Sequence, residues 1–159
     1  MISLIDETVK TIGRISSDLR TVVLDDLGLM AALRRQGQEF EKHTGIRSTF
    51  SSPLVNFNPE RNLAINIFRV YQEALTNIVR HARATEVETQ LELTDGYIRL
   101  IIKDNGHGIE HNELINKNSL GLIGMRERAI MLNGDLIIEN NQPNGTIIIL
   151  KVPLNTNVD

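Results

Sequence analysis

The segment from Asp104 to Ile109 carries the residues best suited to bind a ligand in this chain of 159 residues. It directly follows Tyr97 to Lys103, an apolar run that predicts a strand. A carboxylate at the end of a strand can be held at the floor of a pocket as a hydrogen-bond acceptor. Gly106 and Gly108 would let the backbone approach a flat ligand, because neither has a Cβ atom. By itself the segment is equally typical of an ordinary Asp-Asn-Gly turn.

A second group of polar side chains, Glu73, Asn77 and His81, recurs at every fourth residue within the segment from Asn58 to Ala82. On an α-helix this spacing places them along one side, with Arg80 next to them. Carboxylate and amide oxygens can hold Mg²⁺ or its waters, and arginine and histidine can face phosphate oxygens. A solvated helix face has the same pattern, so the helix taken alone leaves both interpretations open. The apolar face of the predicted helix consists of Leu63, Ile67, Tyr71, Ala74, Leu75, Ile78 and Ala82.

Two further segments contain glycine next to a predicted element. From Ser119 to Arg128, Gly121 and Gly124 form a glycine-rich loop that runs into an amphipathic helix. Backbone amides at such a helix start can bind phosphate, although two glycines before a helix are a weak signal. Gly145 and Thr146 come directly before an apolar run that predicts a buried strand.

The order of these four segments resembles the ATP-binding domain of sensor histidine kinases, within the ATPase superfamily that includes gyrase, Hsp90 and MutL. Glu73 to Ala82 is similar to the N box of the family, and Asp104 to Ile109 matches its first glycine box. Gly121 to Met125 resembles the second glycine box, and Gly145-Thr146 the last. The resemblance runs from about Leu19 to Val152.

Two longer motifs resemble one subfamily, that of the nitrate and nitrite sensors and the membrane-lipid sensor kinases. They are Asn-x-x-Arg-His-Ala, starting at Asn77, and Gly-Leu-x-Gly-Met-Arg-Glu-Arg, starting at Gly121. The segment from Leu19 to Leu29 resembles the junction between its dimerisation helices and its ATP-binding domain. The chain departs from the family at Thr21, where proline is usual, and at Ser119, where glycine is usual. Because serine reaches positive φ less easily than glycine, the second departure leaves undetermined the conformation of the predicted lid, the segment from Glu110 to Asn118.

The resemblance implies ATP and Mg²⁺ as cofactors and assigns roles to single residues. Asp104 would accept a hydrogen bond from the exocyclic amine of adenine, with Thr146 supporting it from the neighbouring strand. Asn77 would bind Mg²⁺, and Glu73 would position a water around the ion. The remaining predicted nucleotide-binding residues are Arg80, His81, Gly106, Gly108, Ile109, Ser119, Gly121, Leu122, Gly124 and Met125.

Composition fits this interpretation and excludes several other classes. The formal charge of −3 implies no nucleic-acid surface. The absence of cysteine excludes disulfides, zinc thiolates and thiol nucleophiles. No apolar run approaches the roughly 20 residues of a membrane span, and no signal peptide is visible. We therefore expect a cytoplasmic domain, which a membrane-bound sensor would also contain.

The expected fold is an α/β, two-layer sandwich, in which helices cover one face of a mixed sheet (the Bergerat ATP-binding fold). The resemblance implies that residues 1–24 are a remnant of a dimerisation helix and residues 25–159 the ATP-binding domain. Apolar residues at near-heptad spacing over 1–20 predict a helix with one apolar seam, and a core helix packed on its own domain is the alternative. Asn58 and Pro59 are predicted to begin the helix that carries Asn77, and Glu110 to Asn118 to form a mobile lid. The other predicted elements are a helix over 26–43, a helix that follows the glycine-rich loop and ends at Asn133-Gly134, and strands over 46–50, 86–93, 97–103, 135–140 and 146–152.

A histidine kinase also needs a phospho-accepting histidine, which the family places on its first dimerisation helix. None of His43, His81, His107 and His111 fits that position, so we expect the chain to lack the acceptor. The favoured explanation is that the chain begins partway through the second dimerisation helix, and the alternative is that its gene encodes a partial kinase. The predicted function is the catalytic domain of a two-component sensor histidine kinase. The whole kinase would be a homodimer that signals to a response regulator with a helix-turn-helix output domain. Two alternatives stay open: a serine kinase or switch module of the anti-sigma type, and a non-catalytic interaction module.

Overall fold

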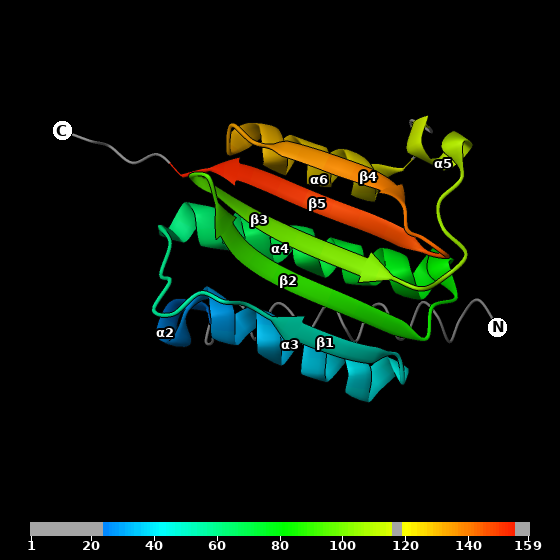
Figure 1. Cartoon of the computed structure of the whole chain (residues 1–159), viewed down its shortest axis with the longest axis horizontal. Helices are drawn as coiled ribbons and strands as arrows, with labels where there is room; N and C mark the ends of the chain where they lie inside the picture. The colour runs from blue at the N-terminus through cyan, green and yellow to red at the C-terminus, as the bar shows by residue number, and fades with distance from the viewer. Residues whose placement is uncertain (1–23, 116–118, 155–159) are drawn as a thin grey trace.

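The computed structural model describes residues 24–115 and 119–154, which form two layers (Figure 1). The near-heptad segment and the first five residues of the junction that begins at Leu19 lie outside the described residues. The boundary expected after residue 24 therefore stays a prediction.

Five strands form a single mixed sheet in the order β1-β2-β3-β5-β4. Strand β1 pairs in parallel with β2, and the other neighbours are antiparallel. In the two central strands, β3 and β5, alternate side chains are buried against the helices, as a sheet covered on one face requires. The strands are β1 (Arg47–Ser51), β2 (Glu86–Thr94), β3 (Tyr97–Asp104), β4 (Asp135–Asn140) and β5 (Thr146–Pro153).

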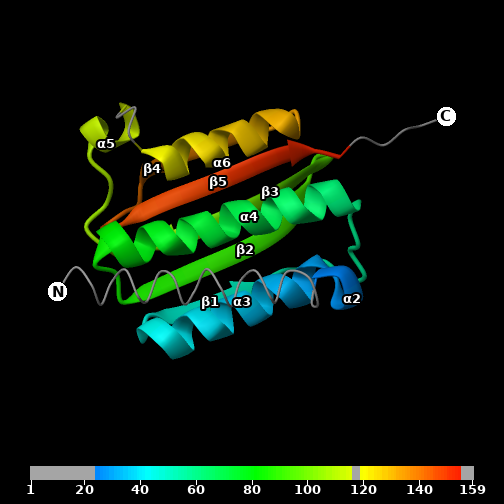
Figure 2. The same cartoon turned by 180° about the vertical axis from the view of Figure 1, so that it is seen from behind.

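Three long helices lie side by side on one face of the sheet, as Figure 2 shows from behind. They are α3 (Leu29–Thr44), α4 (Arg61–Asn77) and α6 (Leu120–Met131). A π-helical turn, η2 (Ile78–Ala82), continues α4, and two short helices complete the described fold, α2 (Asp25–Leu27) and α5 (His111–Ile115). The predicted α/β sandwich is confirmed.

Three predicted helix boundaries are wrong. The helix expected from Asp26 is broken at Gly28, whose φ of 85° lies outside the helical range. Helix α4 begins after Glu60 rather than at Asn58, and no side chain caps it. Helix α6 already begins at Leu120, so its glycines lie within the helix and not in a preceding loop.

Apolar residues on one stripe of α6 explain this early start. Met125 and Ala129 are each 1% exposed, and Leu122 and Leu132 pack against the same core. The burial of these residues outweighs the low helix propensity of the glycines, because tertiary packing contributes most of the stability of a short helix.

Candidate functional site

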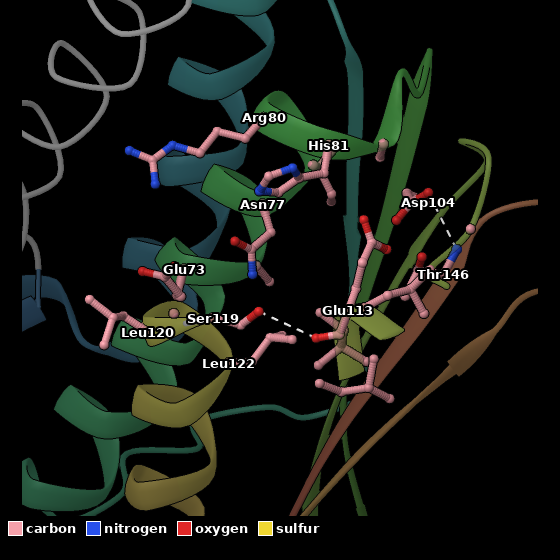
Figure 3. A pocket seen from close by; sticks show the side chains of 18 residues that line it. Glu73, Asn77, Arg80, His81, Asp104, Glu113, Ser119, Leu120, Leu122 and Thr146 are labelled. Carbon is pink, nitrogen blue, oxygen red and sulfur yellow. Dashed lines mark hydrogen bonds between the residues drawn. The ribbon is translucent and has the colours of Figure 1, made fainter. Parts of the chain in front are cut away.

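A pocket of about 480 Å³ lies between the C-terminal end of α4 with its π-helical turn, the start of α6, and the adjoining ends of β3, β4 and β5 (Figure 3). It gathers residues from all four segments that the sequence singles out. The predicted site residues that line it are Glu73, Asn77, Arg80, His81, Asp104, Gly108, Ile109, Ser119, Gly121, Leu122 and Thr146.

Three predicted site residues do not line the pocket, and each has another position. Gly106 is buried beneath the end of the π-helical turn, where a Cβ atom would lie 2.1 Å from the carbonyl oxygen of Ala82. Met125 is buried in the core, 1% exposed. Gly124 lies in α6, with no atom within 4 Å of the place a Cβ would take.

Asp104 is a buried carboxyl group at the end of a central strand, 5% exposed. Its Oδ1 accepts hydrogen bonds from the backbone amides of Gly106 (2.8 Å) and Thr146 (3.3 Å). Burial raises the pKa of Asp104, while these two amides and the charge of His107 partly oppose that rise. Among the described residues, the bonds to this carboxyl group all reach Oδ1, which leaves Oδ2 for a ligand. The predicted contact with Thr146 is present, donated by the backbone amide and not by the side chain.

Asn105 fastens the Asp104 loop to the connection between the π-helical turn and β2. Its Oδ1 accepts hydrogen bonds from the amides of Thr85 (2.9 Å) and Glu86 (3.0 Å), and its Nδ2 donates to the hydroxyl of Thr85 (2.9 Å). The amide of His107 donates to the carbonyl oxygen of Ala82 at 2.9 Å. The loop is therefore held to the end of the helix that carries Asn77.

Asn140 and Asn141 hold the other side of the same loop. Oδ1 of Asn140 accepts a hydrogen bond from the amide of Ile109 (2.9 Å), and Nδ2 of Asn141 donates to the carbonyl oxygen of Asp104 (3.2 Å). Gly108 has a φ of 85° and lies so close to Asn140 that a Cβ atom would approach its Oδ1 to 2.6 Å. Asn105, Asn140 and Asn141 were missed from the sequence. Asparagines near glycine indicate turns, but they do not reveal which distant loop they bind.

The polar stripe on α4 and the π-helical turn forms the opposite side of the pocket. Glu73 and Asn77 come from α4, and Arg80 and His81 from the wider turn that follows. In Figure 3 the side chains of Asn77 and His81 lie next to one another, whereas Arg80 extends away from Asp104. Arg80 and His81 are exposed, so both are free to reorient toward a ligand.

The N-terminal end of α6 closes the pocket near Glu73. Ile123 donates to the carbonyl oxygen of Ser119 (3.1 Å), so the amides of Leu120, Gly121 and Leu122 precede the internal ladder of the helix. These amides point out of the helix end, where its dipole favours an anion. The hydroxyl of Ser119 donates to the carbonyl oxygen of Glu113 (3.3 Å), which joins α6 to α5 across residues 116–118.

Apolar side chains form the walls between the Asp104 end and the α6 end. Ile138 and Ile148 lie in two of the predicted strands, but the sequence did not single them out as pocket residues. Both line the pocket, as Ile78, Ala82 and Ile109 do. This apolar slot with one carboxylate at its floor suits a flat heterocycle that carries an amine.

Two findings concern what the described residues lack. Within residues 24–115 and 119–154, no group of three or more His, Asp or Glu side chains is placed to hold a metal ion. None of the helices in that part of the chain is long and apolar enough to cross a membrane.

Residues 62–156 match the family described as histidine kinase-, DNA gyrase B-, and HSP90-like ATPases. The chain belongs to this family. It is thus an ATP-binding domain, and the predicted family is confirmed.

Relatives of this ATPase domain are sensor kinases. It is 37% identical over 153 residues to the signal transduction histidine-protein kinase/phosphatase DegS of Brevibacillus brevis, covering 96% of this chain and 39% of the relative. It is 36% identical over 149 residues to the oxygen sensor histidine kinase NreB of Staphylococcus carnosus, covering 92% and 42%. The chain therefore spans about two fifths of the length of these relatives.

The fold of the ATPase domain is also similar to a solved structure. The histidine kinase domain of the blue-light activated histidine kinase EL346 of Erythrobacter litoralis superposes with a TM-score of 0.66 at 25% identity. That match covers 79% of this chain and 61% of the other.

Proposed function

We propose that this ATP-binding domain is the catalytic domain of a two-component sensor histidine kinase. The observation that carries the proposal is one pocket that joins the buried carboxylate of Asp104 to the polar stripe of Glu73 and Asn77. These two ends suit the two ends of ATP. The names of DegS and NreB, both histidine kinases, support the same class of activity.

Asp104 is proposed to recognise adenine. An ionised carboxylate can only accept hydrogen bonds, and the exocyclic amine of adenine is a donor. The backbone amides of Gly106 and Thr146 hold Oδ1, which leaves Oδ2 to accept that donor. Ile138 and Ile148, which are paired across β4 and β5, would then pack together against one side of the base.

Asn77 and Glu73 fit a magnesium ion that is bound together with the phosphates. Their oxygens are of the type that Mg²⁺ prefers, and the spacing of four residues puts both on one side of α4. Two protein ligands suffice when phosphates and waters fill the other positions of the ion. Bound there, Mg²⁺ would neutralise phosphate charge.

The phosphates are proposed to lie between the polar stripe and the start of α6. The amides of Leu120, Gly121 and Leu122 would donate to phosphate oxygens, and Arg80 and His81 would turn toward them. Most of the work of such a domain is positioning and charge neutralisation. In the whole kinase, an imidazole nitrogen of an acceptor histidine forms a bond to the γ-phosphorus, the bond to the β–γ bridging oxygen breaks, and ADP leaves.

The rest of the proposed function concerns the whole protein. The acceptor histidine would lie on dimerisation helices, the kinase would act as a cytoplasmic homodimer, and a response regulator with a helix-turn-helix output domain would receive the phosphoryl group. A trans-phosphorylation assay tests this activity. With labelled ATP and Mg²⁺, the chain should phosphorylate a fragment of the parent kinase that carries both dimerisation helices, and the label should be acid-labile.

In the same assay the chain alone should bind ATP but acquire no phosphohistidine. Its four histidines lie on the ATP-binding domain itself, where none is held in line with a γ-phosphate bound at α6. Acid-stable label on a partner serine would instead establish a serine kinase. Label on His43, His81, His107 or His111 would show that the acceptor is not missing.

Replacing Asn77 tests the magnesium assignment. Asn77→Ala removes one oxygen ligand but no adenine contact, so titration calorimetry should show ATP binding that has lost most of its dependence on Mg²⁺. ADP without metal should bind as it does to the unchanged chain. Loss of metal-free ADP binding by a folded variant would mean that Asn77 shapes the pocket instead.

A further inference from the structure

Arg128 lies in the motif that continues the second glycine box, yet it is two helical turns away from the pocket. It is half-buried on α6, and its Nη1 donates a hydrogen bond to Oδ1 of Asn66 on α4 at 3.0 Å. Asn66 is 3% exposed, which is unusual for an amide side chain and requires that its polar atoms be bonded. Its Nδ2 donates to the carbonyl oxygen and to Oδ1 of Asn62, at 2.9 and 3.2 Å.

The bond between Arg128 and Asn66 lies in the interface between α4 and α6, which also borders the pocket. Gly121 meets Glu73 there, so closely that a Cβ atom on Gly121 would approach Oε1 of Glu73 to 2.1 Å. Gly121 and Arg128 are seven residues apart on α6, as Glu73 and Asn66 are on α4. Seven residues are about two turns, or roughly 10.5 Å. The two helices therefore run antiparallel, side by side, and touch at matching points (Figure 2).

Because of this geometry, the hydrogen bond between Arg128 and Asn66 can fix the register of α6 along α4. Apolar packing by Met125 and Ala129 holds α6 on the core, but such packing is not directional and permits small rotations and slips. A hydrogen bond from a guanidinium to a buried amide fixes both distance and angle. A slip of α6 by one turn, about 5.4 Å, would break the bond and would also move Gly121 away from Glu73.

We propose that Arg128 and Asn66 are positioning residues for the phosphate end of the ATP pocket. They hold α6 in the register at which the amides of Leu120, Gly121 and Leu122 face the phosphate chain. The inference rests on the proposed function of those amides. Neither residue touches the nucleotide, and neither affects the Asp104 end, which is held by its own backbone contacts.

The two ends of the ligand separate this role from a merely structural one. Adenosine needs only the Asp104 end, whereas ATP needs both. The measurement is the ratio of ATP affinity to adenosine affinity, obtained by calorimetry with Mg²⁺ for Arg128→Ala, Asn66→Ala and the double variant. Arg126→Ala is the matched control, since Arg126 belongs to the same helix and motif but is exposed.

Each single variant should lower the ratio about fivefold or more, with adenosine affinity unchanged. In the double variant the ratio should fall no further than in the worse single variant, because each single variant already removes the bond between Arg128 and Asn66. Arg126→Ala should keep the ratio. Arg128→Lys, which retains the charge and the apolar stem, covers the case in which an alanine variant fails to fold. It should lower the ratio in part.

Three results would overturn the inference. The ratio could stay the same in all folded variants, adenosine affinity could fall as much as ATP affinity, or the two single effects could add. If the unchanged chain itself does not prefer ATP to adenosine, the proposed phosphate site fails, and the inference fails with it. A preference that survives in the variants refutes only the positioning role.

Discussion

The two ends of the pocket are built in different ways. At the Asp104 end, one backbone amide from the loop after β3 and one from β5 hold the carboxylate, and Asn105, Asn140 and Asn141 fasten that loop on both sides. At the α6 end, single side-chain bonds join the helix to its neighbours: Ser119 to Glu113 at its start, and Arg128 to Asn66 two turns further along.

This difference indicates how the domain divides its work. The Asp104 end, proposed to bind the base, is held by hydrogen bonds within the protein, and such contacts lower the free energy that binding must supply for ordering. The phosphate end depends on the placement of one helix that follows residues 116–118. In the proposed kinase ADP must leave after each transfer, and a phosphate end held by fewer bonds than the base end suits that cycle.

Among the variants considered, Gly145→Ala should have the largest effect on stability, because it disrupts the Asp104 end of the pocket. Gly145 has a φ of 105°, and a Cβ atom there would lie 1.8 Å from the carbonyl oxygen of Asp104. Strain and overlap together should lower the free energy of unfolding by about 3 kcal/mol or more, measured by urea denaturation. Gly96→Ala is the matched control, with a φ of 79° but open space around its Cβ position. Equal losses for both variants would show that Asp104 is not held by this contact.

Asp104→Asn should abolish base recognition without unfolding the chain. Asn can still accept the two backbone amides at Oδ1, but its Nδ2 would face the adenine amine with a second donor. ATP affinity should fall by roughly a hundredfold by calorimetry, in line with the penalty for a mismatched buried pair. Asp95→Asn, at an exposed turn, should leave it unchanged. A folded Asp104→Asn variant that binds ATP normally would contradict the role of this residue.

The raised pKa of Asp104 gives that variant a second signature, in the absence of nucleotide. A carboxyl group whose pKa is raised in the folded state contributes stability below its ordinary pKa, and this contribution is lost as the pH rises through the raised value. As the pH rises through this range, the unfolding free energy of Asp104→Asn should therefore increase relative to that of the unchanged chain. At pH 7 the variant should be at least as stable.

Adenine and guanine nucleotides differ only in the base, so comparing their affinities tests the Asp104 end of the pocket alone. Guanine presents a carbonyl oxygen where adenine presents its amine, so ionised Asp104 would face an acceptor. ATP and ADP should bind about ten- to a hundredfold more tightly than GTP and GDP by calorimetry. Asp104→Asn should narrow this difference. Equal affinities for ATP and GTP in the unchanged chain would leave Asp104 without its assigned role.

Gly124→Ala should have the smallest effect, and in the opposite direction. Gly124 lies within α6 with open space around its Cβ position. Alanine in a helix interior is favoured over glycine, so the unfolding free energy should rise by about 0.5–1 kcal/mol in a thermal or urea melt. ATP affinity should stay the same because the backbone amide is kept. A loss of affinity would mean that Gly124 must leave the helical conformation when ATP binds.

The base end was predictable from sequence because its main elements are local. Asp104 and Thr146 lie at the ends of two apolar, alternating strands, and antiparallel pairing of such neighbours brings the ends together. The family motifs added Asn77 and Glu73, both of which line the pocket, and their roles at a metal ion stay a prediction. The contacts of Asn105, Asn140 and Asn141 were not predictable, since each joins loops whose proximity only the folded chain creates.

The start of α6 was misjudged for a related reason. Two glycines after a serine favour a loop by local propensity, whereas the burial of Met125 and Ala129 selects a helix. The role of Arg128 was likewise hidden, because its partner on α4 is 62 positions away. Local helix and loop propensities predict the structure of the α6 end poorly, because packing between helices decides it.

The π-helical turn at the end of α4 has a consequence for the spacing of the site. Such a turn arises where an α-helix contains one residue more than its regular repeat can hold. Here the wider turn brings the carbonyl oxygen of Ala82 under His107 and Gly106, so that the Asn77 side and the Asp104 side of the pocket share one piece of backbone. Removing a single residue between Asn77 and Ala82 would restore an ordinary helix, rotate its end by roughly 100°, and separate the two sides. The number of residues in this turn is therefore as much a part of the ATP site as their identities.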